Sequence, residues 1–78
     1  MANRKVSVSL NSIEKVKSFV NTISDFDSDF DLVSGRYIID AKSIMGIFSL
    51  DLSRPIDLII HNLDLEDKIL EAIKEYLA

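Results

Sequence analysis

The sequence contains no cysteine and no tryptophan, one proline, one histidine and two glycines. Without cysteine the chain has no disulfide framework and no thiolate metal site, which fits a reducing compartment. One histidine and no glycine-rich phosphate loop leave no recognisable catalytic set, so we expect no enzyme, no bound metal and no cofactor. The first ten residues lack the apolar stretch of a signal peptide, and no run approaches the roughly 20 apolar residues that span a bilayer. We therefore expect a soluble, cytoplasmic protein without membrane contact.

Length and charge narrow the possible functions further. The 78 residues, 47% of them hydrophobic and 28% charged, are typical of one globular domain spanning 1–78. A chain this short leaves little volume for a deep substrate pocket. Thirteen acidic against nine basic side chains give a net charge of −4, which disfavours binding to a nucleic-acid backbone.

Hydrophobic periodicity predicts an α+β fold in the order β-α-β-β-α-β-α. In chain order, the expected elements are a strand 4–10, a helix capped by Asn11 and ending near Ile23, a hairpin 26–39, one or two helical turns within 40–52, a strand 56–62, and a helix from Asp64 nearly to the end. In the first helix, Glu14 completes a capping box with Asn11. The strand after Pro55 is apolar on both faces, which indicates a central strand. This order favours helices on one face of an open, four-stranded, mainly antiparallel sheet.

Apolar side chains at helical spacing define the expected buried stripes of the two long helices. They are Ile13, Val16, Phe19, Val20 and Ile23 in the first helix, and Leu65, Ile69, Leu70, Ile73, Tyr76 and Leu77 in the last. Aspartates alternate with other residues at Asp25, Asp27, Asp29 and Asp31. An EF-hand loop would need glycine and glutamate where Phe30 and Arg36 stand, so we interpret these aspartates as a solvated strand face.

The segment Lys42-Ser43-Ile44-Met45-Gly46-Ile47-Phe48-Ser49-Leu50 resembles the K-S-I-M-G-V-M-S-L stretch of HPr, the small phosphocarrier of the bacterial sugar phosphotransferase system. The likeness continues without gaps into the strand 56–60, and the element order and length match that family across nearly the whole chain. The resemblance implies the HPr fold, an open-faced β-sandwich.

In the HPr family, phosphate is carried by the histidine of a G-I-H-A-R-P stretch between the first strand and the first helix. The family's spacing places Ser12 at the histidine position, Glu14 at the arginine and Lys15 at the proline. A serine forms a stable phosphate ester rather than a transferable phosphoramidate, and Glu14 would repel phosphate at close range. The resemblance therefore implies a variant without the phosphocarrier histidine, similar to the catabolite-repression HPr-like protein. The single histidine, His61, is expected on the outer face of the sheet, opposite in parity to Ile60.

Ser43 stands at the position that a bifunctional kinase/phosphorylase modifies in HPr from many Gram-positive bacteria, where the product is a corepressor for a sugar-responsive transcriptional repressor. The resemblance implies that Ser43 is a regulatory phosphorylation site and that Ile44, Met45 and Phe48 dock partner proteins. Alternatives remain open for these residues. Ser43 is also a plausible helix cap, and Met45 and Ile47 can be core residues with Phe48 half-covered. A phosphocarrier with an unrecognised acceptor and a phosphate-independent interaction module are the rival functions.

Overall fold

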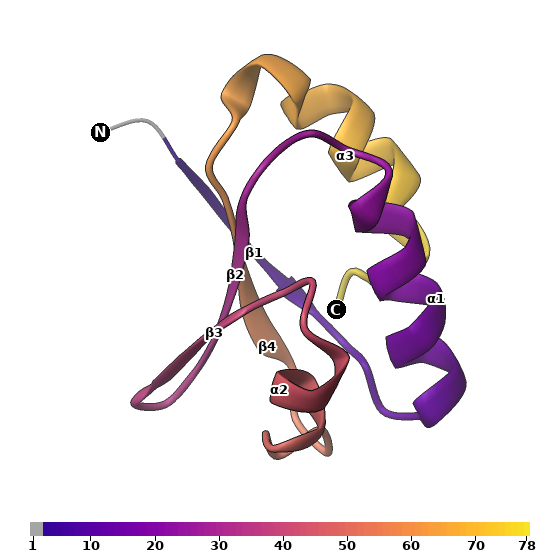
Figure 1. Cartoon of the computed structure of the whole chain (residues 1–78), viewed down its shortest axis with the longest axis vertical. Helices are drawn as coiled ribbons and strands as arrows, with labels where there is room; N and C mark the ends of the chain where they lie inside the picture. Colours follow the sequence, from indigo (N-terminus) through magenta and orange to yellow (C-terminus); the bar gives the residue numbers. More distant parts are fainter. Residues whose placement is uncertain (1–2) are drawn as a thin grey trace.

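A computed structural model describes residues 3–78, which form four strands and three α-helices (Figure 1). The elements are β1 (Arg4–Val8), α1 (Ile13–Ser24), β2 (Phe30–Ser34), β3 (Tyr37–Asp40), α2 (Ile44–Phe48), β4 (Ile56–Ile60) and α3 (Glu66–Ala72), with single 3₁₀ turns at Leu63–Leu65 and Lys74–Tyr76. The predicted order and the open-faced α+β sandwich are confirmed.

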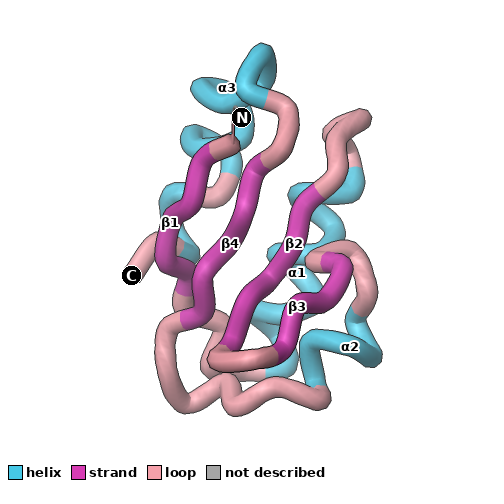
Figure 2. Tube along the Cα trace, turned by 90° about the vertical axis from the view of Figure 1, so that its left-hand side faces the viewer, coloured by secondary structure: helices cyan, strands magenta, loops and turns pink. Residues whose placement is uncertain are grey.

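The sheet has the strand order β1-β4-β2-β3, and each neighbouring pair is antiparallel (Figure 2). β4 is central, as its two apolar faces predict. In β4 the buried residues Ile56, Leu58 and Ile60 alternate with partly exposed ones, so one face of the sheet meets the helices and the other remains open. The side chains that the sheet and helices bury together form a continuous core, made mainly of Val8, Leu10, Val16, Phe19, Ile23, Phe30, Leu32, Ile47, Ile56, Leu58, Ile60, Ile69 and Ile73.

The hairpin between β2 and β3 has a two-residue turn, because Ser34 pairs directly with Tyr37. Gly35 has a φ of 60°, the left-handed conformation that glycine adopts without steric cost. Arg36 has a negative φ, as expected at the second position of a type II′ turn.

The first helix begins differently from the prediction. Ser12 is its N-cap, with Oγ accepting a hydrogen bond from the Lys15 N–H at 3.1 Å, so the predicted cap at Asn11 with Glu14 is wrong. Ile13, predicted to be buried with the rest of its stripe, is 62% exposed because it lies in the first turn, before the helix reaches the core.

The alternating aspartates were predicted to lie on a strand face, but most of them lie in the loop between α1 and β2. β2 begins only at Phe30, whose partner Ile60 is the last residue of β4. Residues before Phe30 therefore have no strand to pair with, and 25–29 form a loop. Asp31 is the one aspartate of the series within β2.

The remaining differences concern element ends. Strands β1 and β4 stop at Val8 and Ile60, two residues earlier than predicted. The last helix is not continuous: Asn62 caps a 3₁₀ turn, α3 ends at Ala72, and a second 3₁₀ turn follows. Tertiary contacts explain the final turn, because the Tyr76 carbonyl accepts a hydrogen bond from the Ser9 N–H at 2.7 Å.

Candidate functional site

An exposed apolar surface lies where the start of α1 approaches the end of α2. Ile13 from α1 and Phe48 from α2 line one hollow of about 320 Å³, together with Ser12. Met45 lies one turn before Phe48 on α2. The exposed fractions are 62% for Ile13, 81% for Met45 and 40% for Phe48. We call these three residues the apolar surface; exposed groupings of this kind are typical of protein-binding sites.

The predicted docking residues divide between the surface and the core. The alternative that Met45 and Ile47 are core residues with Phe48 half-covered is wrong for Met45, which is exposed, and right for Ile47 and Phe48. Ile47 is the fully buried residue of α2 and anchors the helix. Ile44 is partly buried and packs against the core, which leaves it less accessible than Met45.

Ser43 caps α2, as its position predicts. Its Oγ accepts a hydrogen bond from the Gly46 N–H at 3.2 Å, and its carbonyl accepts one from the Ile47 N–H at 3.0 Å. These bonds satisfy donors that the first turn of a helix otherwise leaves without partners. The side chain is partly exposed, so the hydroxyl combines a structural role with access from solvent.

Gly46 permits this close approach. A Cβ at position 46 would lie 3.2 Å from Ser43 Oγ and 3.3 Å from Ile39 Cδ1, which is tighter than ordinary van der Waals contact. Glycine in the middle of a helix is otherwise unfavourable. In the pattern Ser43-x-x-Gly46, the missing side chain at position 46 therefore lets the cap oxygen of Ser43 pack tightly against the helix backbone.

The segment before α2 is fixed by Asp40 and Lys42. Asp40 Oδ1 accepts from the Lys42 N–H at 2.9 Å, and its carbonyl accepts from the Ser43 N–H at 3.0 Å. The Lys42 ammonium donates to the Phe26 carbonyl at 3.0 Å and lies 5.6 Å from the centre of the Phe30 ring. Lys42 thus ties α2 to the loop after α1, and its ammonium is already engaged.

Ser12, Glu14 and Lys15 lie together in the first turn of α1. All three are exposed, and they line a second hollow with Ser18 and Tyr76. Ser12 occupies a helix N-terminus, where backbone N–H groups and the helix dipole favour anions. Glu14 places a carboxylate in the same turn.

His61 lies away from this turn. It follows β4 directly, and its Nε2 is 2.7 Å from Oδ2 of Asp31. Asp31 alternates with the buried Phe30 and Leu32, so it points to the open face of the sheet. The sheet therefore separates His61 from the helices that carry Ser12 and Ser43.

Residues 3–78 contain neither a membrane-spanning helix nor a metal-binding cluster. No helix among them is both long and apolar enough to cross a membrane. No group of three or more histidine, cysteine, aspartate or glutamate side chains among them is placed to hold a metal ion.

Ile13 was missed as a site residue because helical spacing assigned it to the buried stripe. Its position next to a candidate cap is the signal that could have identified it. Side chains in the first turn of a helix often lie beyond the edge of the sheet that the helix covers. Ser12 and Ile13 both come before Val16, the first buried residue of α1.

The fold and this surface define a class: a small open-faced α+β protein with serine-capped helix starts at α1 and α2 and with exposed apolar side chains on both helices. The protein-family model described as "PTS HPr component phosphorylation site" matches residues 13–78. The chain therefore belongs to the HPr phosphocarrier family of the phosphotransferase system. Members of this family are phosphate carriers rather than catalysts, and they interact with other proteins of that system.

Solved structures agree with the family assignment. HPr-C-His from Thermoanaerobacter tengcongensis has a TM-score of 0.73 and 27% sequence identity, over 96% of this chain and 89% of that one. Phosphocarrier protein HPr from Bacillus anthracis str. Ames has a TM-score of 0.72 and 28% identity, over 99% of this chain and 96% of that one. No curated protein sequence matches this chain significantly.

Proposed function

We propose that this protein is a regulatory member of the HPr family that acts by binding other proteins. Phosphorylation of Ser43 is the switch, and Ile44, Met45 and Phe48 are the docking residues. The observation that carries the proposal is the 81% exposed Met45 and 40% exposed Phe48 on the short helix that Ser43 caps. Large apolar side chains held in solvent are costly unless a partner covers them.

A phosphate on Ser43 would change the border of this surface. It adds about 1.5 to 2 negative charges and three strong acceptor oxygens at neutral pH. The Lys42 ammonium is held at the Phe26 carbonyl, and Asp40 lies next to the cap. The N–H groups at the start of α2 favour the added charge, and the phosphate oxygens that face solvent are open to recognition by a basic group of a partner, such as an arginine.

Ser12 does not favour a phosphate relay. A hydroxyl at that position forms a stable ester, and the exposed Glu14 adds a negative charge in the same turn. The single histidine is on the other side of the sheet and is paired with Asp31. We therefore propose that protein binding, rather than phosphate transfer, is the function of this family member.

The proposal is tested by incubating the purified protein with ATP and a Gram-positive HPr kinase/phosphorylase and measuring the intact mass of the protein. Fragmentation locates the phosphate. We expect one phosphoryl group on Ser43, and none on the Ser43→Asn variant, which keeps an N-cap acceptor. An ordinary HPr in the same tube controls for kinase activity. If that HPr is labelled and this protein is not, the phosphate-independent module becomes the better explanation.

Two further arms separate the rival functions. Incubation with phosphoenolpyruvate and the general phosphotransferase enzyme tests for a carrier, and acid-labile phosphate on His61 would contradict our proposal. The Phe48→Asp variant tests the docking surface, because a charge there opposes burial by a partner. We expect Phe48→Asp to abolish binding to the transcriptional repressor while the circular dichroism spectrum is unchanged.

A further inference from the structure

Met45 is, at 81%, the most exposed large hydrophobic side chain among residues 3–78. It belongs neither to the buried core nor to the partly buried side chains that pack against the core. The helix that carries it, α2, is instead held by the buried Ile47 and by the Ser43 cap. A chemical change at the Met45 side chain therefore alters the apolar surface and leaves the fold intact.

Met45 is also the member of the apolar surface that an oxidant changes readily. Ile13 and Phe48 carry hydrocarbon side chains, whereas Met45 carries a thioether. The sequence has no cysteine and two methionines, and Met45 is the one methionine within residues 3–78. Oxidation of a thioether gives a sulfoxide, which is polar and chiral. The reactive sulfur of residues 3–78 therefore lies in the surface that we propose for docking.

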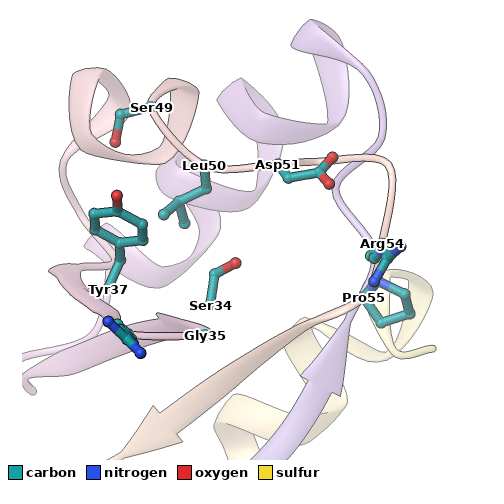
Figure 3. A pocket seen from close by; sticks show the side chains of 9 residues that line it. Ser34, Gly35, Tyr37, Ser49, Leu50, Asp51, Arg54 and Pro55 are labelled. Atoms are coloured by element: carbon teal, nitrogen blue, oxygen red, sulfur yellow. The ribbon is translucent and has the colours of Figure 1, made fainter.

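A larger hollow of about 440 Å³ lies between the β2–β3 turn and the loop that joins α2 to β4 (Figure 3). Its walls come from residues 34–37 and from residues within 49–55, and none of the lining side chains carries sulfur. Asp51 in one wall accepts from the Ser53 hydroxyl at 2.6 Å and from the Ser53 N–H at 3.1 Å, which lowers the pKa of the Asp51 carboxyl. Because peroxides oxidise thioethers and thiols in proteins, this hollow is an internal control that oxidation should leave unchanged.

We propose that Met45 is a reversible oxidation site through which hydrogen peroxide weakens partner binding, an inference that rests on the proposed function of the apolar surface. A lone pair of the Met45 sulfur attacks one oxygen of the peroxide and forms the S–O bond. The O–O bond breaks, and the other oxygen takes up the released proton and leaves as water. The sulfur is oxidised by two electrons and the peroxide is reduced. Methionine sulfoxide reductases A and B reverse the change, one enzyme for each sulfoxide epimer.

The sulfoxide weakens binding because its oxygen is a hydrogen-bond acceptor at a place where a partner buries apolar side chains. Burial of an acceptor without a donor is unfavourable, whereas a thioether is favourably buried. Met45 and Phe48 are three residues apart on α2 and are therefore neighbours on its surface. A partner that covers Phe48 also covers Met45. We expect the affinity for the partner to fall by at least about tenfold on oxidation.

The test uses the protein phosphorylated at Ser43 and measures its affinity for the transcriptional repressor before and after treatment with hydrogen peroxide. Mass spectrometry with fragmentation distinguishes an oxygen added at Met45 from one added at Met1. We expect Met45 to react at close to the rate of a methionine in a short peptide. The affinity should fall by at least about tenfold and recover after treatment with both reductases. Backbone amide resonances should shift in residues 44–48 and stay unchanged in residues 34–37.

Two variants assign the effect to the Met45 sulfur. Met45→Leu removes the sulfur and keeps an apolar side chain of similar volume; whatever its affinity, that affinity should be the same before and after peroxide. This variant retains Met1, so a loss of affinity that persists in it would overturn the proposal. Met45→Gln carries a permanent polar group and should bind at least about tenfold more weakly than the parent.

The outcomes separate this proposal from the proposed function. Equal affinity of the oxidised and untreated parent, an affinity that the reductases do not restore, or an unchanged affinity in Met45→Gln would overturn the oxidation site alone. Absence of repressor binding by the untreated, phosphorylated protein would overturn the proposed function and this inference with it.

Discussion

The cap of α2 can be tested by replacing Ser43 with alanine. The change removes the oxygen that accepts the Gly46 N–H at 3.2 Å, and it leaves the Ser43 carbonyl bonded to the Ile47 N–H at 3.0 Å. α2 has only five residues, so it has no further turns whose hydrogen bonds could offset the loss of this one. Loss of a serine N-cap costs about 1 kcal/mol. The helix should therefore be weakened but not lost.

We expect the free energy of unfolding to fall by about 1 kcal/mol in Ser43→Ala, with a melting temperature lower by about 4 to 8 °C for a domain of this size. Ser43→Asn supplies another N-cap acceptor and should stay within about 0.5 kcal/mol of the parent protein. Urea unfolding followed by circular dichroism measures both variants, and the slope of the transition should not change.

Two results would refute this reasoning. If Ser43→Ala is as stable as the parent, water replaces the cap oxygen at no cost. If Ser43→Asn loses as much as Ser43→Ala, the hydroxyl contributes through something other than its bond to Gly46. The pair also serves the kinase experiment, because Ser43→Asn removes the phosphorylation site while the cap remains.

Three further predictions concern Gly46 in α2, Tyr76 near the C-terminus and Asp51 in the loop after α2. Gly46→Ala should stabilise the protein more in a Ser43→Ala background than in the parent, because the crowding oxygen is gone; equal effects in a double-mutant cycle would contradict the close contact. Tyr76→Phe should lower the free energy of unfolding by about 1 kcal/mol, since it removes the part-buried hydrogen bond to a serine of α1; an unchanged urea midpoint would show that this bond contributes nothing. Ser53→Ala should raise the pKa of Asp51 toward its ordinary value in an NMR titration, because the hydroxyl donor is lost. The depressed pKa stabilises the folded state above the ordinary aspartate pKa, and this contribution disappears as the pH falls through the folded-state value; an unchanged Asp51 titration would exclude the Ser53 hydroxyl as the cause.

The fold could be predicted because each long element has a clear hydrophobic period and because β4 is apolar on both faces. Errors arose where two local interpretations were equally compatible with the residues. Asn11 and Ser12 are both good N-caps, and only the observed bond to the Lys15 N–H identifies Ser12. The alternation from Asp25 to Asp31 suits a strand, but a strand needs a partner, and β4 ends at Ile60. The length over which two strands pair depends on the tertiary structure, so a local sequence pattern does not predict it.

Only part of the candidate site could be predicted, because a local pattern does not show which side chains tertiary packing covers. The cap at Ser43 follows from residue type and spacing, but exposure depends on what covers each side chain. Met45 and Ile47 are both large apolar residues of one short helix, yet Met45 is 81% exposed and Ile47 is fully buried. Ile13 has the helical spacing of the buried stripe, but it is exposed because it is the first residue of α1. Sequence periodicity identifies the apolar residues, whereas packing against neighbouring layers decides which ones a partner can reach.

Under the proposed function, the chain has a partner surface although serine, not histidine, stands at position 12. Met45 and Phe48 are positioned by the Ser43 cap and by burial of Ile47, both of which belong to α2 and not to the start of α1. A phosphate relay and a docking surface therefore place separate demands on the fold. Under the proposed function, charge added at the cap would alter binding at the border of the apolar surface while the core, which contains no buried charged group among the described residues, stays unchanged. The expected consequence is a change in partner affinity with little change in the sheet.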